Sequence, residues 1–181
     1  INEFESVNVD DFLLVDLNSL IVDIRMLTYG PEHTVEIGDN QYTSLLTDLE
    51  FNKDMQKKIQ DKEFRTIKTK SGSTVVLRLQ TVRESNDNKK IVSKLWNNNL
   101  LYFYDTISSI ESIDGVTNKL DIEKFLRDRN KITPLEGVQI REKIKSMNCG
   151  YDLDDVMYYD TKDTDKKEGV KLPLQISSNF F

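Results

Sequence analysis

The longest periodic segment of the chain lies near its beginning, where apolar residues recur three or four positions apart over residues 10–28. The apolar members are Leu13, Leu17, Leu20, Ile21, Ile24 and Leu27, and the opposite side carries Asp16, Ser19 and Asp23. This spacing predicts an amphipathic helix. Asp10 and Asp11 lie where the helix dipole favours negative charge, and Gly30-Pro31 ends the helix.

Length and composition allow a globular protein with a modest core. The chain has 181 residues, 38% of them hydrophobic, and a formal net charge of −6. This length suits one domain or two small ones. A single Cys and a single His exclude a disulfide framework and a four-ligand Cys/His zinc site within one chain. We expect a soluble protein with no membrane partner, since no apolar run reaches the ~18 residues of a membrane span and no secretory leader pattern opens the chain.

Two β-hairpins are predicted after the helix. They comprise residues 34–37 with 41–46, around Gly38-Asp39-Asn40, and residues 64–69 with 74–82, around Ser71-Gly72-Ser73. The second hairpin has the alternation of a strand with one buried face, with Val75, Leu77 and Leu79 on one side and Val76, Arg78 and Gln80 on the other. The basic residues between the hairpins, 53–62, are predicted to be helical or irregular.

A polar segment over residues 83–90 predicts a loop, and it is the expected boundary to a helical C-terminal half. The first of three predicted helices presents large apolar residues at helical spacing, namely Trp96, Leu100, Phe103, Ile107 and Ile110. The second covers about residues 120–129. The third has an explicit start, with Thr133 as N-cap, Pro134 at the first helical position and Glu136 completing a capping box, and it ends near Cys149-Gly150.

The end of the chain is predicted to be extended, with a strand over residues 156–159, a charged loop over 160–169 and a segment over 170–176. Pro173 cannot donate to a central ladder, so this last segment is an edge strand or an arm. The predicted fold is therefore α+β. It has an N-terminal amphipathic helix with small β-hairpins in residues 1–84, a helical region in 91–150 and an extended C-terminal arm in 151–181, all within one compact unit.

The sequence offers no convincing catalytic constellation. His33 and Cys149, the only imidazole and the only thiol, could formally make a catalytic dyad but lie far apart in the sequence. We expect His33 to be a surface or capping residue and Cys149 to be a small apolar residue at a helix end. The carboxylate pairs are expected to lie on solvated faces, namely Asp10/Asp11, Asp16/Asp23 and Asp154/Asp155. We therefore predict that the protein is not an enzyme and has no catalytic, cofactor-binding or metal-binding residues.

Two segments superficially resemble ligand-binding motifs and do not fit them. Residues 160–169 are rich in oxygen ligands but lack the residues that a calcium-binding EF loop requires at its fifth and sixth positions. Residues 70–74 lack the order of a phosphate-binding loop. Residues 53–70 carry seven basic residues against three acidic ones, yet the chain as a whole is acidic, so we expect no nucleic-acid partner.

The two terminal phenylalanines are unusual in a polar tail, because each forgoes about 1.5–3 kcal/mol of burial if it stays in water. One hypothesis is that they fold back onto the core of their own chain. The other is that they fill a pocket of a partner, to whose sheet residues 170–176 add a strand. In that case the partner-binding residues are Phe180, Phe181, Leu172, Leu174 and Ile176.

Several short segments carry a resemblance to a known family. They are Leu13-Leu14, residues 24–32 (Ile-Arg-Met-Leu-Thr-Tyr-Gly-Pro-Glu), residues 70–79 (Lys-Ser-Gly-Ser-Thr-Val-Val-Leu-Arg-Leu), Leu172-Pro173-Leu174 and Asn179-Phe180-Phe181. On these segments the chain resembles baseplate proteins of T-even-type tailed bacteriophages that are associated with assembly of the central hub. Many members carry Cys-rich zinc knuckles, whereas this chain has residues 35–40 without Cys at the first place and only Cys149 near the second.

The resemblance implies a non-enzymatic phage baseplate hub protein that acts in tail baseplate assembly, as a chaperone or as a structural subunit. Its partners would be other phage baseplate or hub proteins, in a hetero-oligomer. It would act in the host bacterial cytoplasm during assembly, or remain in the tail baseplate of the virion. Two alternatives stay open: a cellular adaptor unrelated to phages, and a carboxylate-based metal-dependent enzyme.

Overall fold

The structure, a computed structural model, describes residues 8–95, 100–162, 169–176 and 180. It divides into two compact units. Unit 1 comprises Ile1–Leu17 and Asp54–Asn148, and unit 2 comprises Asn18–Lys53 and Cys149–Phe181. The prediction of one compact unit with sequential regions is thus wrong: the C-terminal arm shares a unit with the N-terminal hairpin, because its strands pair with that hairpin.

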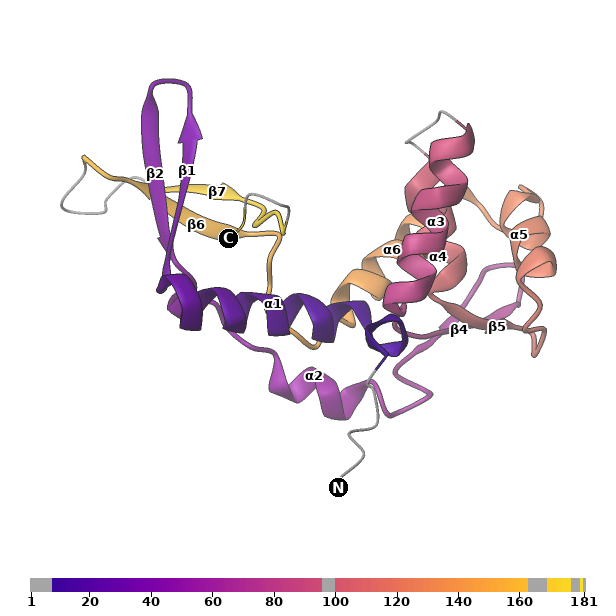
Figure 1. Cartoon of the computed structure of the whole chain (residues 1–181). Helices are drawn as coiled ribbons and strands as arrows, with labels where there is room; N and C mark the ends of the chain where they lie inside the picture. Colours follow the sequence, from indigo (N-terminus) through magenta and orange to yellow (C-terminus); the bar gives the residue numbers. More distant parts are fainter. Residues whose placement is uncertain (1–7, 96–99, 163–168, 177–179, 181) are drawn as a thin grey trace. The chain divides into compact units, whose positions relative to one another are not determined.

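Unit 2 is built on an antiparallel four-stranded sheet of order β1-β2-β6-β7 (Figure 1). Its strands are β1 (Glu32–Ile37), β2 (Asn40–Leu45), β6 (Val156–Asp160) and β7 (Gly169–Leu172), and the short 3₁₀ helix η2 (Leu46–Asp48) follows β2. The predicted first hairpin and the predicted strand over residues 156–159 are confirmed. Pro173 follows β7, which is an edge strand as predicted.

The helix α1 (Leu14–Tyr29) packs against this sheet, preceded by the 3₁₀ helix η1 (Val9–Asp11). Gly30 ends α1 with a φ of 87°, a conformation that favours glycine. The buried core of unit 2 joins Val22 of α1 to side chains of the sheet and the C-terminal segment, namely Leu46, Val156, Tyr158, Leu174 and Phe180.

The structure corrects the expectation for the polar side of α1. Ser19 is buried and Asp23 is half-buried, whereas Leu20, Ile24 and Leu27 on the apolar side are exposed. The predicted helix is present, but in unit 2 it packs through the side that carries Ser19, Val22 and Asp23 and not through the predicted apolar side.

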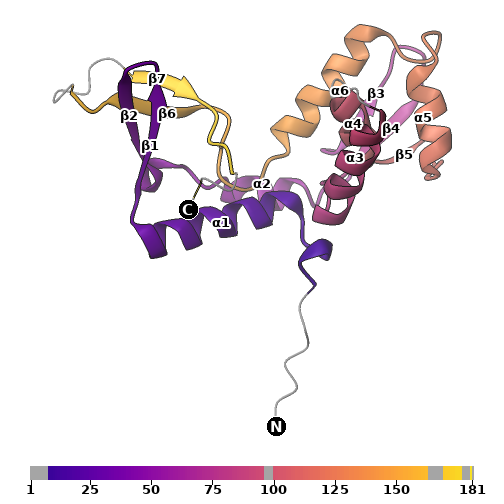
Figure 2. The same cartoon turned by 45° about the horizontal axis from the view of Figure 1, so that its top comes forward.

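Unit 1 combines a small sheet with a group of helices (Figure 2). The antiparallel sheet has the order β3-β4-β5, from β3 (Thr66–Lys68), β4 (Thr74–Leu77) and β5 (Ile110–Ile113). The helices are α2 (Lys53–Lys58), which begins at the boundary of the unit, α3 (Val82–Leu95), α4 (Leu101–Ser108), α5 (Lys119–Arg127) and α6 (Pro134–Ser146). The core of unit 1 consists of apolar side chains from the sheet, from the helices and from residues beside them. They are Val75, Leu77, Ile107, Ile110, Ile113, Ile122, Ile132, Ile140 and Met147.

Several predictions for this region are confirmed and three are wrong. Helices near residues 120–129 and from Pro134 are present, and the start of α6 has the predicted capping box between Thr133 and Glu136. The predicted loop over residues 83–90 is instead part of α3. Ile110 lies in β5 and not in a helix, while Trp96, the first member of that predicted stripe, lies outside the described residues.

The third error concerns β4, which was predicted to bury one face. Val75, Val76 and Leu77 are all buried, so both faces of β4 are covered and the strand is also flanked by β3 and β5. The strand also ends at Leu77, earlier than predicted, and α3 begins at Val82. The mixed α+β class of the chain is confirmed.

Candidate protein interaction surface

Helix α1 carries three large apolar side chains that no part of the described chain covers well. Leu20 and Ile24 are each 44% exposed and Leu27 is 88% exposed. They lie at spacings of four and three residues, so they share one side of the helix over a length of about 10 Å. We call Leu20, Ile24 and Leu27 the α1 stripe.

The opposite side of α1 explains why the stripe faces outward. The Tyr151 hydroxyl donates a hydrogen bond of 2.8 Å to Asp23 Oδ1, and the Tyr151 backbone N–H donates to Ser19 Oγ at 3.4 Å. Burial, together with Asp23, raises the pKa of Tyr151. Val22 is fully buried between these polar contacts. Two hydrogen bonds and one buried side chain therefore fix the rotation of the helix, and in Figure 1 the strands of unit 2 lie on one side of α1.

Arg25 connects α1 to two other parts of unit 2. Its guanidinium donates three hydrogen bonds of 2.9 Å each, to the backbone oxygens of Phe180, Gly30 and Glu32. The guanidinium carbon also lies 5.2 Å from the centre of the Tyr29 ring. One side chain thus holds the end of α1, the start of β1 and the C-terminal segment together, because the planar guanidinium presents several donors in a fixed geometry.

The predicted partner-binding residues form part of the core of unit 2. Phe180 is 2% exposed and its ring centre lies 5.4 Å from that of His33. Leu174 is also buried, and Leu172 and Ile176 pack against the same core. The expectation that Phe180 fills a partner's pocket is therefore corrected in favour of the other hypothesis, that it folds back onto its own chain. Phe181 lies outside the described residues.

His33 contacts this core and is not the surface or capping residue that the sequence predicts. Its Nδ1 forms a 2.9 Å hydrogen bond with the hydroxyl of Tyr158, which is fully buried. Burial raises the pKa of Tyr158 to about 12. Burial and the nearby Arg25 charge lower the pKa of His33, so the imidazole is held neutral at pH 7. Cys149, the other half of the dyad considered above, is buried in unit 2.

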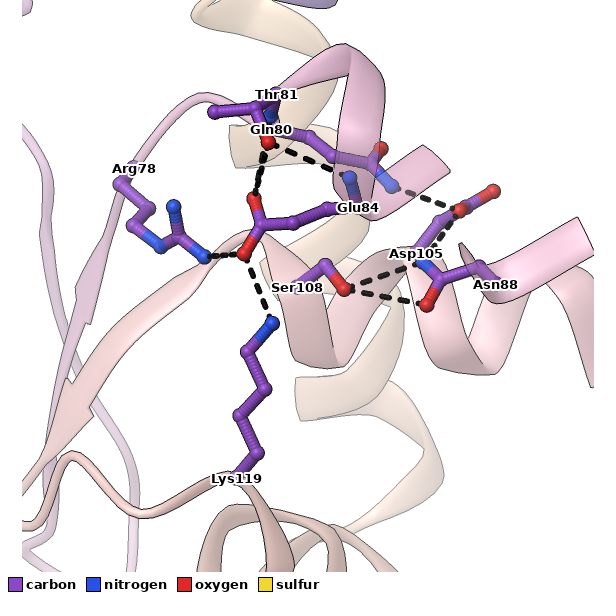
Figure 3. A network of polar contacts seen from close by, with 8 residues as sticks. All are labelled: Arg78, Gln80, Thr81, Glu84, Asn88, Asp105, Ser108 and Lys119. Carbon is purple, nitrogen blue, oxygen red and sulfur yellow. Dashed lines mark hydrogen bonds and ion pairs between the residues drawn. The ribbon is translucent and has the colours of Figure 1, made fainter. Parts of the chain in front are cut away.

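Unit 1 contains a network of polar side chains around the start of α3 (Figure 3). Glu84 forms ion pairs with Arg78 and with Lys119, the latter at 2.8 Å, and accepts hydrogen bonds from the backbone N–H and the hydroxyl of Thr81. Burial opposes ionisation of Glu84, but the hydrogen bonds from Arg78, Lys119 and Thr81 outweigh it and lower its pKa to about 2. A carboxylate with this pKa stays ionised and is a poor proton donor near neutral pH.

The same network continues along α3 to α4. Asp105 accepts hydrogen bonds from Gln80 at 3.1 Å and from Asn88 at 2.9 Å, and Asn88 also donates to Ser108 Oγ at 3.1 Å. Asn88 and Ser108 are buried, so these bonds satisfy groups that would be costly to bury alone. We interpret the network as a structural link between α3 and α4.

Sequence reasoning missed the start of α3, although a signal for it exists. Thr81 and Glu84 have the spacing of a capping box, and both hydrogen bonds of that box are present, since the Glu84 N–H also donates to Thr81 Oγ1. The polar composition of residues 83–90 instead led to the prediction of a loop. By contrast, nothing local in the sequence indicates which side of α1 packs, because Tyr151 lies 128 residues away from Asp23.

Comparisons with protein-family models, curated proteins and solved structures find no match. The interpretation of this chain therefore depends on its own residues. In the part of the chain that the structure describes, no group of three or more His, Cys, Asp or Glu side chains is placed to hold a metal ion. No helix within the described ranges has the length and apolarity needed to cross a membrane.

Proposed function

We propose that this protein is a non-enzymatic baseplate protein of a tailed phage that acts in hub assembly through contacts with other baseplate proteins. It works in the host bacterial cytoplasm, either as a chaperone or as a subunit that stays in the tail baseplate. The observation that carries the proposal is the exposed α1 stripe. The sequence resemblance to hub assembly proteins supports the phage context, and it includes two of the three stripe residues, Ile24 and Leu27.

The free energy available from the α1 stripe supports a contact surface. Burying a Leu or Ile side chain fully contributes about 1.5–3 kcal/mol, and the part still available scales with the exposed fraction, which is 44% for Leu20 and Ile24 and 88% for Leu27. Together the three residues give roughly 3–5 kcal/mol. Association of two proteins costs an estimated 4–15 kcal/mol in lost freedom, so the stripe must form the centre of a wider interface with a polar rim.

A cellular adaptor would use the same surface, and the identity of the bound partner separates it from a phage protein. None of the contacts described above supports the alternative of an enzyme that uses carboxylates. The two most strongly engaged acids, Glu84 and Glu136, each sit at the third position of a helix and satisfy a capping box. Hydrogen bonds from Arg78, Lys119 and Thr81 lower the pKa of Glu84. Hydrogen bonds from Thr133 and from the backbone N–H of Lys70 lower the pKa of Glu136.

The test is affinity capture of the tagged full chain from its native host, with comparison of two variants. The stripe variant combines Leu20→Gln, Ile24→Gln and Leu27→Gln, and the control carries Leu120→Gln, an exposed leucine of α5 in unit 1. We expect tail baseplate proteins to co-purify with the wild type and the control and to be lost with the stripe variant. Capture of non-tail proteins only, or equal capture by all three chains, contradicts the proposal.

The same preparation decides between the two assembly roles. A chaperone is present in assembly intermediates and absent from purified mature particles, whereas a structural subunit is present in both. Quantitative mass spectrometry of the two fractions measures this directly.

A further inference from the structure

We propose that the α1 stripe binds an amphipathic helix of a partner protein whose apolar side is flanked by Lys and Arg residues. This inference rests on the proposed function, because it names the kind of partner that the same surface takes. It is argued from the spacing of the stripe, the charge of the unit that carries it and the contacts that orient α1.

The spacing of the stripe matches one side of a helix–helix contact. Leu20, Ile24 and Leu27 follow each other at four and three residues. This is the repeat by which two helices interdigitate side chains along a shared seam. An extended strand presents side chains at alternate positions and cannot match the stripe over more than a short contact. A partner helix with apolar residues at matching positions can do so over the whole stripe.

The net negative charge of unit 2 favours basic residues beside the apolar side of the partner helix. Unit 2 contains 13 Asp and Glu against 6 Lys and Arg, a formal charge of −7, whereas unit 1 contains 18 against 19, a formal charge of +1. The acidity of the chain therefore resides in the unit that carries the stripe. At physiological salt, charges interact over about 8 Å, so a partner docked on α1 experiences those charges of unit 2 that lie within this distance of the stripe.

The seam itself is flanked by acids on one side. Asp23 lies one position before Ile24, and Asp16 lies seven residues earlier on the same side of α1 and is exposed. Arg25, the only basic residue of α1, is engaged by its three backbone hydrogen bonds, and Asp23 is half-buried and accepts the hydrogen bond from Tyr151. The exposed flanking charge is therefore that of Asp16, which favours Lys or Arg at the facing position of the partner.

The same charges disfavour a second copy of this chain as the occupant. A symmetric contact through the stripe brings together two units of −7. In an antiparallel pair, Asp16 and Asp23 face the same positions of the other copy, and like charges in such places destabilise the contact. A basic partner is attracted to the acidic side chains, whereas a second copy is repelled by them.

The test uses two synthetic peptides of equal length and identical Leu and Ile seam residues. One has Lys and the other has Glu at the positions that flank the seam. Binding of each peptide to the full chain is measured by fluorescence anisotropy at low and at high salt. We expect the Lys peptide to bind at least about tenfold more tightly than the Glu peptide at low salt, and this advantage to shrink as salt is raised.

Matched variants show whether the Lys peptide binds at the stripe. We expect Ile24→Gln with Leu27→Gln to weaken its binding at least about tenfold, Asp16→Asn to reduce the salt dependence, and Leu120→Gln to change neither. Equal binding of the two peptides overturns the inference, as does Lys-peptide binding that the stripe variants leave unchanged. So does a dimer of the free chain, seen by analytical ultracentrifugation, that the stripe variants dissociate.

Failure of this inference is distinguishable from failure of the proposed function. If neither peptide binds while capture of baseplate proteins still depends on the α1 stripe, the helix partner is wrong and the assembly role stands. If the Lys peptide binds at the stripe while no baseplate protein is captured, the partner chemistry stands and the phage role is wrong.

Discussion

The side chain of Arg25 and the backbone of Phe180 are joined by a 2.9 Å hydrogen bond from Nε to the carbonyl oxygen. This contact spans 155 positions of the sequence and fixes the C-terminal segment to the end of α1. It places the Phe180 ring in the core of unit 2, beside His33. Phe180 is thereby part of the fold, whereas Leu20, Ile24 and Leu27 on α1 are exposed apolar side chains of unit 2.

Replacement of Arg25 is expected to destabilise unit 2. Arg25→Gln removes the charged donors to three backbone oxygens, and we expect the free energy of unfolding to fall by about 2–3 kcal/mol. Arg25→Lys keeps the charge but not the planar arrangement of donors, so it should recover only part of that loss. Urea unfolding measures both. The control is Arg83→Gln, which removes an exposed ion pair with Asp11 and should cost less than about 1 kcal/mol.

Phe180→Ala is expected to lower stability without affecting partner capture through the α1 stripe. Removing a buried Phe side chain typically costs about 3–5 kcal/mol, and we expect a loss in this range. Hydrogen exchange of unit 2 amides reports the loss. A variant with unchanged exchange but with lost partner capture would show that Phe180 acts on the partner, contrary to its burial here.

Glu84 should make unit 1 sensitive to acid. Its folded pKa of about 2 lies below the unfolded value near 4.5, so its contribution is fully present above about pH 4.5 and is lost as pH falls toward 2. Glu84→Gln should therefore destabilise unit 1 at pH 7, by about 1–3 kcal/mol, and make little difference near pH 2. Urea titrations of both chains at several pH values measure the difference. A constant difference across this range contradicts the ion-pair explanation.

Titration of His33 should lower the stability of unit 2 as pH falls, over a higher pH range than the titration of Glu84. Its folded pKa lies below the unfolded value of 6.5, so the unfolded chain binds a proton first and unit 2 loses stability as pH falls below about 6.5. His33→Gln should reduce this slope between pH 7 and pH 5, while the carboxylates titrate as before. Hydrogen exchange of unit 2 across this interval is the measurement. A steeper slope in the variant than in the wild type would show that the folded state favours the charged imidazole.

The sequence predicts those elements whose determinants are local. Thr133, Pro134 and Glu136 specify the start of α6 within four residues, and the turn at Gly38 places the first hairpin. Thr81 and Glu84 carry an equally local signal for α3, which the polar residues after them concealed. In each of these cases the hydrogen bonds close within a few positions, so the pattern can be found without knowledge of the rest of the fold.

The features that depend on distant partners could not be predicted. The contact of Tyr151 with Asp23 determines which side of α1 packs, and the contact of Arg25 with Phe180 positions the C-terminal segment. In each pair the two residues are more than 120 positions apart. The pairing of β4 with β5 likewise joins residues that are more than 30 positions apart. The α1 stripe was visible in the sequence as an apolar side, but its exposure depends on these distant contacts.

The most direct measurement of whether the α1 stripe is a contact surface is site-specific photo-crosslinking in the native host. A benzophenone amino acid is placed at Leu27, and in a separate chain at Tyr102, which is 75% exposed on α4 and serves as the control. We expect Leu27 to crosslink to a tail baseplate protein, at a position in a helix flanked by Lys or Arg, and Tyr102 not to. No product specific to Leu27, in a chain that melts at the wild-type temperature, would contradict the assignment of this surface.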